Sequence, residues 1–354
     1  MPTTTTRAAV YDRDGSITLK DLVLDAPAKG ELVVRITACG ICPGEVLAWY
    51  VARKAPFVLG HEPVGVIEHC GEGAAPGSNG AKPFAVGERV FVHHHAPCMT
   101  CRACLRGDHV QCATWRSTHL VPGGMSTFAV VPEANVRADV LRLPDSLGDD
   151  VATLIEPLAT VVKSVRRSRM RAGDRVLIIG LGVMGLLHVA LARKRGAGSL
   201  LAADRVPERL ACALRMGADR ALDVSNGKIE ELVAAETGGA GADVVIVGPG
   251  STSAMDDALR CVARGGTIVL FSPLPEHERW PLPVHDVYFK DVTITASYSA
   301  GPDDTREALE LLNGGIDVAP LFTHRFPLDG VVDAYRLVAE ARAALKVVVY
   351  PGAR

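Results

Sequence analysis

The chain has 354 residues, of which 48% are hydrophobic and 22% are charged, and its formal net charge is −2. This length suits two compact domains, and the composition is that of a globular protein with sizeable apolar cores. The near balance of charge, without a long basic block, argues against a nucleic-acid-binding protein or a protein anchored by a polybasic segment. No apolar run approaches the roughly 20 residues that span a bilayer.

The N-terminal segment, MPTTTTRAAVYDRDG, lacks the apolar core of a secretory signal peptide, so we expect a cytoplasmic protein. Thiols stay reduced in the cytosol. The nine cysteines are therefore interpreted as metal ligands or small buried residues, and not as a disulfide framework.

Short β-like runs dominate the first part of the chain, and glycines and prolines separate them. The pattern predicts a β-barrel or sandwich without a strong helix. The runs cover residues 31–38, 64–69, 88–93 and 128–132.

The pattern changes near residue 148, where a long apolar-periodic stretch predicts a helix over 151–170. Mostly apolar strands then alternate with helices, which is typical of a parallel sheet covered on both faces. The expected strands are 175–180, 199–204, 242–247 and 267–272, with helices beginning near Val183, Pro207 and Thr252. Beyond residue 297 we expect helices over 303–313 and 329–341 and a last strand over 345–350.

A glycine-rich turn follows the first of these strands. It reads Gly180-x-Gly182-x-x-Gly185, with Val183 and Met184 at the start of the following helix. The glycines permit a tight turn, a close approach of a pyrophosphate and close packing of helix on strand, and the helix N-terminus offers free N–H groups to phosphates. The alternative is a purely structural turn, but the strand and helix around it favour a dinucleotide site.

An acidic residue lies at the end of the next strand. Asp204 comes 24 residues after Gly180, near the usual spacing for the acid that binds the ribose hydroxyls. A carboxylate there repels a 2′-phosphate, so NAD is favoured over NADP. Arg205 is adjacent and weakens that preference, because it could meet a phosphate.

Four cysteines lie close together in the sequence with the spacing C-x2-C-x2-C-x7-C. Four thiolates at about 2.3 Å complete a tetrahedral zinc site and leave no open position, so such a site is structural. An iron–sulfur cluster or four unrelated thiols are the alternatives. The four residues are Cys98, Cys101, Cys104 and Cys112.

A second group of candidate ligands is dispersed. Cys42 is followed by His61 and Glu62, and Glu156 lies near the start of the expected long helix. One thiolate, one imidazole and a carboxylate could hold a catalytic zinc ion that polarises an alcohol oxygen. The alternative is that these residues are unrelated.

The order of GIC, GHE, the four-cysteine loop, EPLA and GLGVMG resembles the zinc-dependent medium-chain dehydrogenases over essentially the whole chain, and most of all the sorbitol, threonine and secondary-alcohol dehydrogenases. The resemblance implies an α/β protein with a GroES-like β-barrel catalytic domain, 1–148 and 298–354, and an inserted Rossmann NAD-binding domain, 149–297. It implies two zinc ions per chain, one catalytic and one structural. It also implies a homodimer or homotetramer.

The resemblance assigns roles to single residues. Cys42 and His61 match catalytic zinc ligands, Glu62 matches a neighbouring or exchangeable acid, and Glu156 matches the distal ligand of the polyol branch. By family position, Thr160 touches the cofactor near the nicotinamide. Cys39 is interpreted as a packed thiol.

The sequence departs from the family after the catalytic cysteine. Where the family carries x-Ser/Thr-Asp, this chain has Pro43, Gly44 and Glu45. Glu45 can orient the histidine ligand, but Gly44 has no hydroxyl to relay a proton. Glu45, Glu62, a water or a histidine among residues 93–97 or at 119 remain as carriers.

These features together predict a reversible, NAD-dependent oxidation of a secondary alcohol on a polyol, sugar, cyclitol or related small metabolite. The alternatives are an epimerase or a natural-product carbonyl reductase with the same zinc and NAD machinery, or a dinucleotide-binding scaffold without turnover.

Overall fold

The computed structural model describes residues 4–352 apart from 75–81, 226 and 343. The described chain divides into two compact units. Unit 1 comprises Met1–Ala159, Ala300–Gly315 and Phe322–Arg354, and unit 2 comprises Thr160–Ser299 and Ile316–Leu321. None of the described helices is long and apolar enough to cross a membrane.

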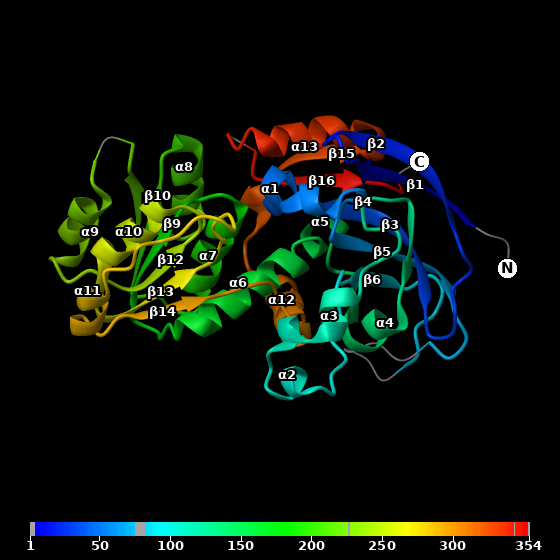
Figure 1. Cartoon of the computed structure of the whole chain (residues 1–354), viewed down its shortest axis with the longest axis horizontal. Coiled ribbons are helices and arrows are strands. Elements are labelled where there is room, and N and C mark those ends of the chain that lie inside the picture. Colours follow the sequence, from blue (N-terminus) through cyan, green and yellow to red (C-terminus); the bar gives the residue numbers. More distant parts are fainter. Residues whose placement is uncertain (1–3, 75–81, 226, 343, 353–354) are drawn as a thin grey trace. The chain divides into compact units, whose positions relative to one another are not determined.

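Unit 1 is built on two β-sheets (Figure 1). A three-stranded sheet has the order β2-β1-β4, and a seven-stranded sheet has the order β15-β16-β3-β5-β6-β8, with β7 paired to β3. The strands are β1 (Thr4–Tyr11), β2 (Ile17–Leu24), β3 (Leu32–Gly40), β4 (Phe57–Val58), β5 (Glu62–Cys70), β6 (Arg89–Val92), β7 (Phe128–Val131), β8 (Val140–Arg142), β15 (Phe322–Pro327) and β16 (Lys346–Tyr350).

The connections of unit 1 carry helices. Those before residue 148 are three to seven residues long, and they lie in loops where the sequence pattern predicts no strong helix. They are η1 (Pro43–Val46), α1 (Ala48–Val51), η2 (Ala52–Lys54), α2 (Arg102–Leu105), η3 (His109–Gln111), α3 (Ala113–Ser117) and α4 (Glu133–Asp139), followed later by α5 (Asp149–Ala152), α12 (Pro302–Asn313), η5 (Leu328–Gly330) and α13 (Val331–Ala339).

The predicted helix over 151–170 is interrupted. The structure has α5 and then α6 (Ile155–Ser168), which begins in unit 1 and ends in unit 2. The interruption falls at the short segment Thr153–Leu154, whose residues are fully buried.

Unit 2 is a six-stranded parallel sheet with the order β11-β10-β9-β12-β13-β14 (Figure 1). Helices α7, α8 and α10 pack on it. Its elements are β9 (Arg175–Ile179), α7 (Val183–Lys194), β10 (Ser199–Asp204), α8 (Pro207–Arg215), β11 (Arg220–Asp223), α9 (Ile229–Thr237), β12 (Ala242–Val247), α10 (Thr252–Cys261), β13 (Val262–Leu270), α11 (Val284–Phe289), β14 (Thr293–Ala296) and η4 (Ala319–Leu321).

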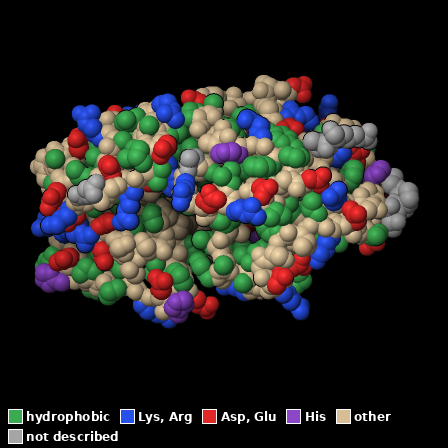
Figure 2. Space-filling view, turned by 90° about the horizontal axis from the view of Figure 1, so that it is seen from above, with side chains coloured by type: hydrophobic (Ala, Val, Ile, Leu, Met, Phe, Trp, Pro, Cys, Tyr) green, Lys and Arg blue, Asp and Glu red, His purple; other side chains and the backbone are tan. Residues whose placement is uncertain are grey.

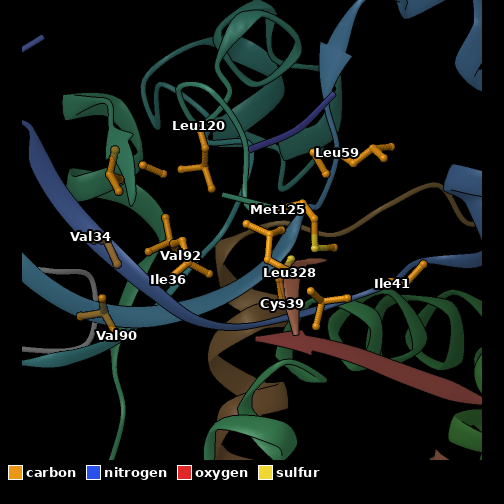
Figure 3. Packing of buried hydrophobic residues seen from close by; sticks show 14 of the residues in the cluster. Val34, Ile36, Cys39, Ile41, Leu59, Val90, Val92, Leu120, Met125 and Leu328 are labelled. Atoms are coloured by element: carbon orange, nitrogen blue, oxygen red, sulfur yellow. The ribbon is translucent and has the colours of Figure 1, made fainter. Parts of the chain in front are cut away.

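Each unit has its own apolar core. In unit 1 the core contains Cys39, Leu59 and Met125 (Figure 3), so Cys39 is a packed thiol as expected. In unit 2 the core lies between the sheet and the helices and includes Leu177, Val245 and Ala258. Burial of these side chains is the main stabilising contribution. On the surface, acidic and basic side chains are interspersed over the face shown in Figure 2.

Candidate active site

Three predicted ligands converge in unit 1. One ligand atom each of Cys42, His61 and Glu62 lies within 4.8 Å of the others. Strand pairing causes this, because Gly40 at the end of β3 is in register with Glu62 at the start of β5. Cys42 follows β3 directly and caps η1, and its sulfur accepts a hydrogen bond from the Gly44 N–H at 3.4 Å.

His61 is oriented by a buried carboxylate. Its Nδ1 lies 2.7 Å from Glu45 Oε1, which leaves Nε2 free to bind an ion. Glu45 also accepts hydrogen bonds from the Gly60 N–H at 3.0 Å and the Tyr335 hydroxyl at 2.5 Å. Burial opposes the ionisation of Glu45, but the His61 charge and these hydrogen bonds hold its pKa below the usual value.

Glu62 forms a buried ion pair with Lys346, the first residue of β16. Both side chains are almost fully excluded from solvent. A Cβ on Gly40 would clash with both groups, so a glycine is needed there. The other carboxylate oxygen of Glu62, Oε1, is buried and has no hydrogen-bond partner among the described residues.

The donor set suits zinc. A thiolate, an imidazole nitrogen fixed by a carboxylate, and a carboxylate with an unpaired oxygen are ligands that Zn²⁺ takes in proteins. The unpaired Glu62 Oε1 is expensive to bury without a partner, and a cation would remove that cost. The residues present therefore fit a zinc ion.

Glu156 lies outside the compact group of three. It is the second residue of α6 and is buried. Its charge acts on Glu62, whose pKa is raised mainly by burial and further by Glu156. Its role as a zinc ligand stays a prediction.

Gly44 leaves free space beside the cysteine. A Cβ at this position would meet the Cys42 sulfur at 3.5 Å, which is an ordinary contact, and no other atom within 4 Å. The absence of a hydroxyl there is thus not imposed by packing.

The histidines that were candidates for proton transfer differ in their surroundings. His93 is buried against Asp139 at 2.5 Å, and Asp139 accepts a hydrogen bond from the Thr305 hydroxyl. His95 contacts the Thr118 carbonyl through Nδ1 at 2.6 Å. These two rings are thus held by structural partners.

His94 lies between the candidate zinc ligands and the surface. Its ring centroid is 6.4 Å from that of His61 and 6.3 Å from that of the exposed His119. Its Nδ1 is buried without a hydrogen-bond partner among the described residues. Among the histidines considered, it has the least fixed hydrogen bonding beside the site.

The four cysteines of the loop form a second compact group in unit 1. The distances between sulfur atoms are 3.9 Å for Cys98–Cys104, 3.6 Å for Cys101–Cys104 and 3.6 Å for Cys98–Cys112. Tetrahedral zinc with Zn–S bonds of 2.3 Å separates sulfurs by about 3.8 Å. None of these thiols forms a disulfide, so the loop fits a closed zinc site.

The glycine-rich turn of unit 2 has the expected local geometry. Gly180 has φ 87°, Gly182 is the N-cap of α7, and the helix begins at Val183. A Cβ on Gly185 would overlap the Gly180 carbonyl, so only glycine lets the helix start there. Met184 and Gly185 follow in the first turn, where N–H groups have no partner within the helix.

Asp204 is more than a candidate ribose ligand. One carboxylate oxygen accepts a hydrogen bond from the Leu181 N–H at 2.6 Å, inside the glycine-rich turn. The other accepts from the N–H groups of Arg205 and Val206 at 2.7 and 2.9 Å. The carboxylate therefore ties the end of β10 to the turn after β9. Thr160 lies half-buried on α6 in the same unit.

Two residues of the site were missed by sequence analysis. Tyr335 on α13 and Lys346 on β16 contact Glu45 and Glu62 across 290 and 284 residues. Lys346 carried one signal, since it is a lone lysine at the start of an apolar strand. Tyr335 carried none.

Comparisons with known proteins agree with this geometry. Residues 28–145 match the alcohol dehydrogenase GroES-like domain, and residues 183–314 match the zinc-binding dehydrogenase domain. The sorbitol dehydrogenase of Bacillus subtilis (strain 168) is 31% identical over 98% of this chain and 97% of its own.

Two solved structures are similar over nearly the whole fold. A zinc-binding dehydrogenase of Sinorhizobium meliloti 1021, bound to NADP, has a TM-score of 0.86 and 26% identity over 98% of this chain and 100% of its own. A protein of Escherichia coli CFT073 described as a short chain alcohol dehydrogenase, complexed with NADH, has a TM-score of 0.86 and 26% identity over 98% of this chain and 99% of its own. With its GroES-like unit, its Rossmann-type unit and its two candidate zinc groups, this chain belongs to the zinc-dependent medium-chain dehydrogenase family and is an oxidoreductase of the alcohol dehydrogenase type.

Proposed function

We propose that this protein oxidises a secondary alcohol of a polyol, sugar, cyclitol or related small metabolite to the ketone, reversibly and with NAD as the hydride acceptor. The observation that carries the proposal is the convergence of Cys42, His61 and Glu62, together with the buried and unpaired Oε1 of Glu62. Similarity to a sorbitol dehydrogenase supports the polyol class.

The residues of unit 1 have separable tasks. Cys42, His61 and Glu62, with Glu156 as a further candidate, would hold a zinc ion, which supplies a Lewis acid that lowers the pKa of an alcohol. Glu45 holds His61 through Nδ1, which would leave Nε2 as the nitrogen that binds the ion. Because Gly44 has no hydroxyl, the alcohol proton must leave by another group, and His94 is our candidate because its ring lies 6.4 Å from that of His61 and its Nδ1 has no partner among the described residues.

In unit 2, Gly180, Gly182 and the first N–H groups of α7 would hold the pyrophosphate of the dinucleotide. We propose NAD over NADP, because the Asp204 carboxylate disfavours a 2′-phosphate. Arg205 makes the preference partial. We propose residues 1–148 and 298–354 as the catalytic domain, and 149–297, including Thr160, as the NAD-binding domain.

We further propose a homodimer or homotetramer. On unit 2, α11 exposes Val284, Tyr288 and Phe289, and the adjacent β14 is the last strand of its sheet. An exposed aromatic patch beside an open strand edge is a surface that a second copy can cover. Light scattering of Phe289→Glu against the native chain tests this. We place the protein in the cytoplasm, where the four loop thiols stay reduced.

The decisive experiment is a panel of polyols, aminocyclitols and secondary alcohols with NAD, followed at the nicotinamide absorbance. We expect net NADH formation with some of them, which an epimerase would not give. Cys42→Ala and Glu156→Ala should lose this activity. Normal turnover by both variants would refute the proposed site.

A further inference from the structure

A buried cation lies against one of the candidate zinc ligands. Among the residues that the structure describes, Lys346 is the one lysine or arginine that is buried, and its side chain is 0% exposed. Its ammonium contacts Oε2 of Glu62. A lysine is almost never fully buried unless it is paired. Its place here is unexpected, because an ammonium repels the zinc ion that the neighbouring side chains would bind.

The backbone of three strands brings the pair together. Gly40 at the end of β3 is in register with Glu62 of β5 and with Val348 of β16. Lys346 precedes Val348 by two residues, so its side chain leaves β16 on the same face of the strand. A Cβ on Gly40 would overlap both Glu62 and the Lys346 ammonium. The missing side chain at Gly40 therefore provides the space in which Lys346 reaches Glu62.

Stability alone does not explain this ion pair. Two charges lose their hydration when they are buried, and apolar side chains of similar volume often stabilise a protein as well or better. The neighbouring strand positions are apolar, since Val347, Val348 and Val349 of β16 are all fully buried. The pair replaces apolar packing only where β16 meets the candidate zinc ligand. This placement indicates a role in the site.

The two oxygens of Glu62 differ in their surroundings. Oε2 is held by the Lys346 ammonium, whereas Oε1 is buried and has no hydrogen-bond partner among the described residues. The ammonium makes Oε2 unavailable to an ion and draws negative charge away from Oε1. Glu62 is thus left with one free donor atom of reduced strength.

The number of donor atoms decides whether the zinc ion can react. A catalytic zinc has three protein ligands and one open position, while a zinc with four protein donors is closed. Cys42 and His61 supply one donor atom each. Glu62 would supply a third through Oε1, and it would close the site if both of its oxygens bound.

We propose that Lys346 is a positioning residue of the candidate zinc site. Its ammonium holds Oε2 of Glu62, so that Glu62 binds the ion through Oε1 alone and one coordination position stays open for the alcohol. This inference rests on the proposed function of the Cys42, His61 and Glu62 group.

The first test measures the affinity for zinc by competition with a chelator, for the ion that is absent in Cys42→Ala. Lys346→Met should bind this ion more tightly by about tenfold or more, because both oxygens of Glu62 are then free and lack any other counter-ion. A lysine that only supported the fold would give the opposite result, since its loss would loosen the site and weaken zinc binding. Unchanged or weaker binding in Lys346→Met therefore overturns the inference.

Three further variants sharpen this measurement. Lys346→Arg keeps a cation and should retain the native affinity. Lys346→Gln removes the charge but keeps an N–H group for Oε2, so it should shift the affinity in the same direction by less, and it serves as the test if Lys346→Met does not fold. Lys20→Met removes a lysine of unit 1 that pairs with Asp12 at the surface, and as the matched control it should change nothing.

The open position has a readout of its own that does not need turnover. Co²⁺ is placed in the site and imidazole, which binds metal ions directly, is titrated while the visible absorption of Co²⁺ is followed. The native chain should respond, and Lys346→Met should need about tenfold more imidazole because the second Glu62 oxygen competes for the same position. Equal responses, or no response in the native chain, overturn the inference.

Turnover separates this inference from the proposed function. With zinc, NAD and an alcohol that the native chain oxidises, Lys346→Met should lower kcat/KM by about tenfold or more, and Lys346→Arg should restore it. If no alcohol is oxidised while the zinc and imidazole results hold, the proposed function fails and the role of Lys346 stands. If alcohols are oxidised well and Lys346→Met binds zinc and imidazole like the native chain, only this inference fails.

Discussion

The two units differ in what they bury. Apart from cysteine thiols, unit 1 buries ionisable groups at several places among the described residues, including Glu45, Glu62, Lys346, His93 and Asp139. In the described part of unit 2, the one such buried side chain is His188, which is held neutral. Burying a charged side chain costs desolvation free energy. We therefore expect buried charges where a bound ion or a reacting group compensates that loss. A dinucleotide, in contrast, is met by backbone N–H groups, which need no buried charge.

The largest expected effect comes from removing the Cys42 thiol in unit 1, the unit that buries ionisable groups. Cys42→Ala should lower kcat/KM by about a thousandfold or more, because a catalytic metal supplies several kcal/mol of transition-state stabilisation. Zinc analysis should fall from two ions per chain to one, with little change in melting temperature. Cys104→Ser is the matched control: it should lose the other ion and lower the melting temperature, because a closed zinc site contributes directly to folding. Equal zinc content in native protein and Cys42→Ala would contradict the assignment.

The buried ion pair of unit 1 should show the largest effect on stability. Where no ion occupies this site, as in a Cys42→Ala background, Lys346→Met leaves the Glu62 charge buried and unpaired, and we expect a loss of about 3–5 kcal/mol in the free energy of unfolding. Denaturant titration measures it. The double variant Glu62→Gln/Lys346→Met should recover much of the loss, since no charge is then left alone. If the double variant is as unstable as the single one, packing and not charge is responsible.

His188 tests the neutral core of unit 2. Its Nδ1 is 2.8 Å from the Met184 carbonyl, its Nε2 is 2.9 Å from the Ser164 hydroxyl, and burial lowers its pKa to about 4. The unfolded chain, with a pKa near 6.5, binds this proton more readily. Its contribution to stability is therefore present above about pH 6.5 and is lost as the pH falls toward 4, about 3 kcal/mol in total.

The measurement is the free energy of unfolding of the whole protein between pH 7 and 4.5, for the native chain and for His188→Gln, which keeps hydrogen bonding but does not titrate. The native chain should lose more stability across this window. Parallel curves would show that another group dominates.

The smallest expected effect concerns the carboxylate that orients His61. Glu45→Gln keeps the shape but weakens the hold on the imidazole, so we expect zinc affinity at this site to fall about 10–100-fold. Competition with a chelator measures this without turnover. Tyr335→Phe, which removes one hydrogen bond to the same carboxylate, should give a smaller change in the same direction. Unchanged affinity in Glu45→Gln would mean that His61 is held by packing alone.

The features whose residues lie close together in the sequence could be predicted from the sequence. The four loop cysteines and the three glycines of the turn each lie within a short segment, so their geometry follows from a few backbone angles. Four strands of unit 2 and the helices α7, α8 and α10 were predicted, because buried parallel strands are apolar along their whole length. The edge strands β11 and β14 are short and partly exposed, and they were not predicted. The first strand of unit 1, with its run of threonines, was not recognised, because alternation is weak in it.

The partners of the charged side chains were not predictable. β16 pairs with β3, with Val349 in register with Cys39, and this pairing brings Lys346 to Glu62. Nothing near residue 346 in the sequence specifies that contact. The ligand assignment of Glu156 depends on the same kind of long-range placement and therefore remains a prediction.

The dual engagement of the Asp204 side chain bears on any attempt to redesign coenzyme preference. Replacing this residue to admit a phosphorylated ribose would also release the Leu181 amide and loosen the turn that we propose as the diphosphate site. A substitution of Asp204 alone should therefore lower the affinity for both NAD and NADP. A successful redesign has to supply a new hydrogen-bond acceptor for the Leu181 amide.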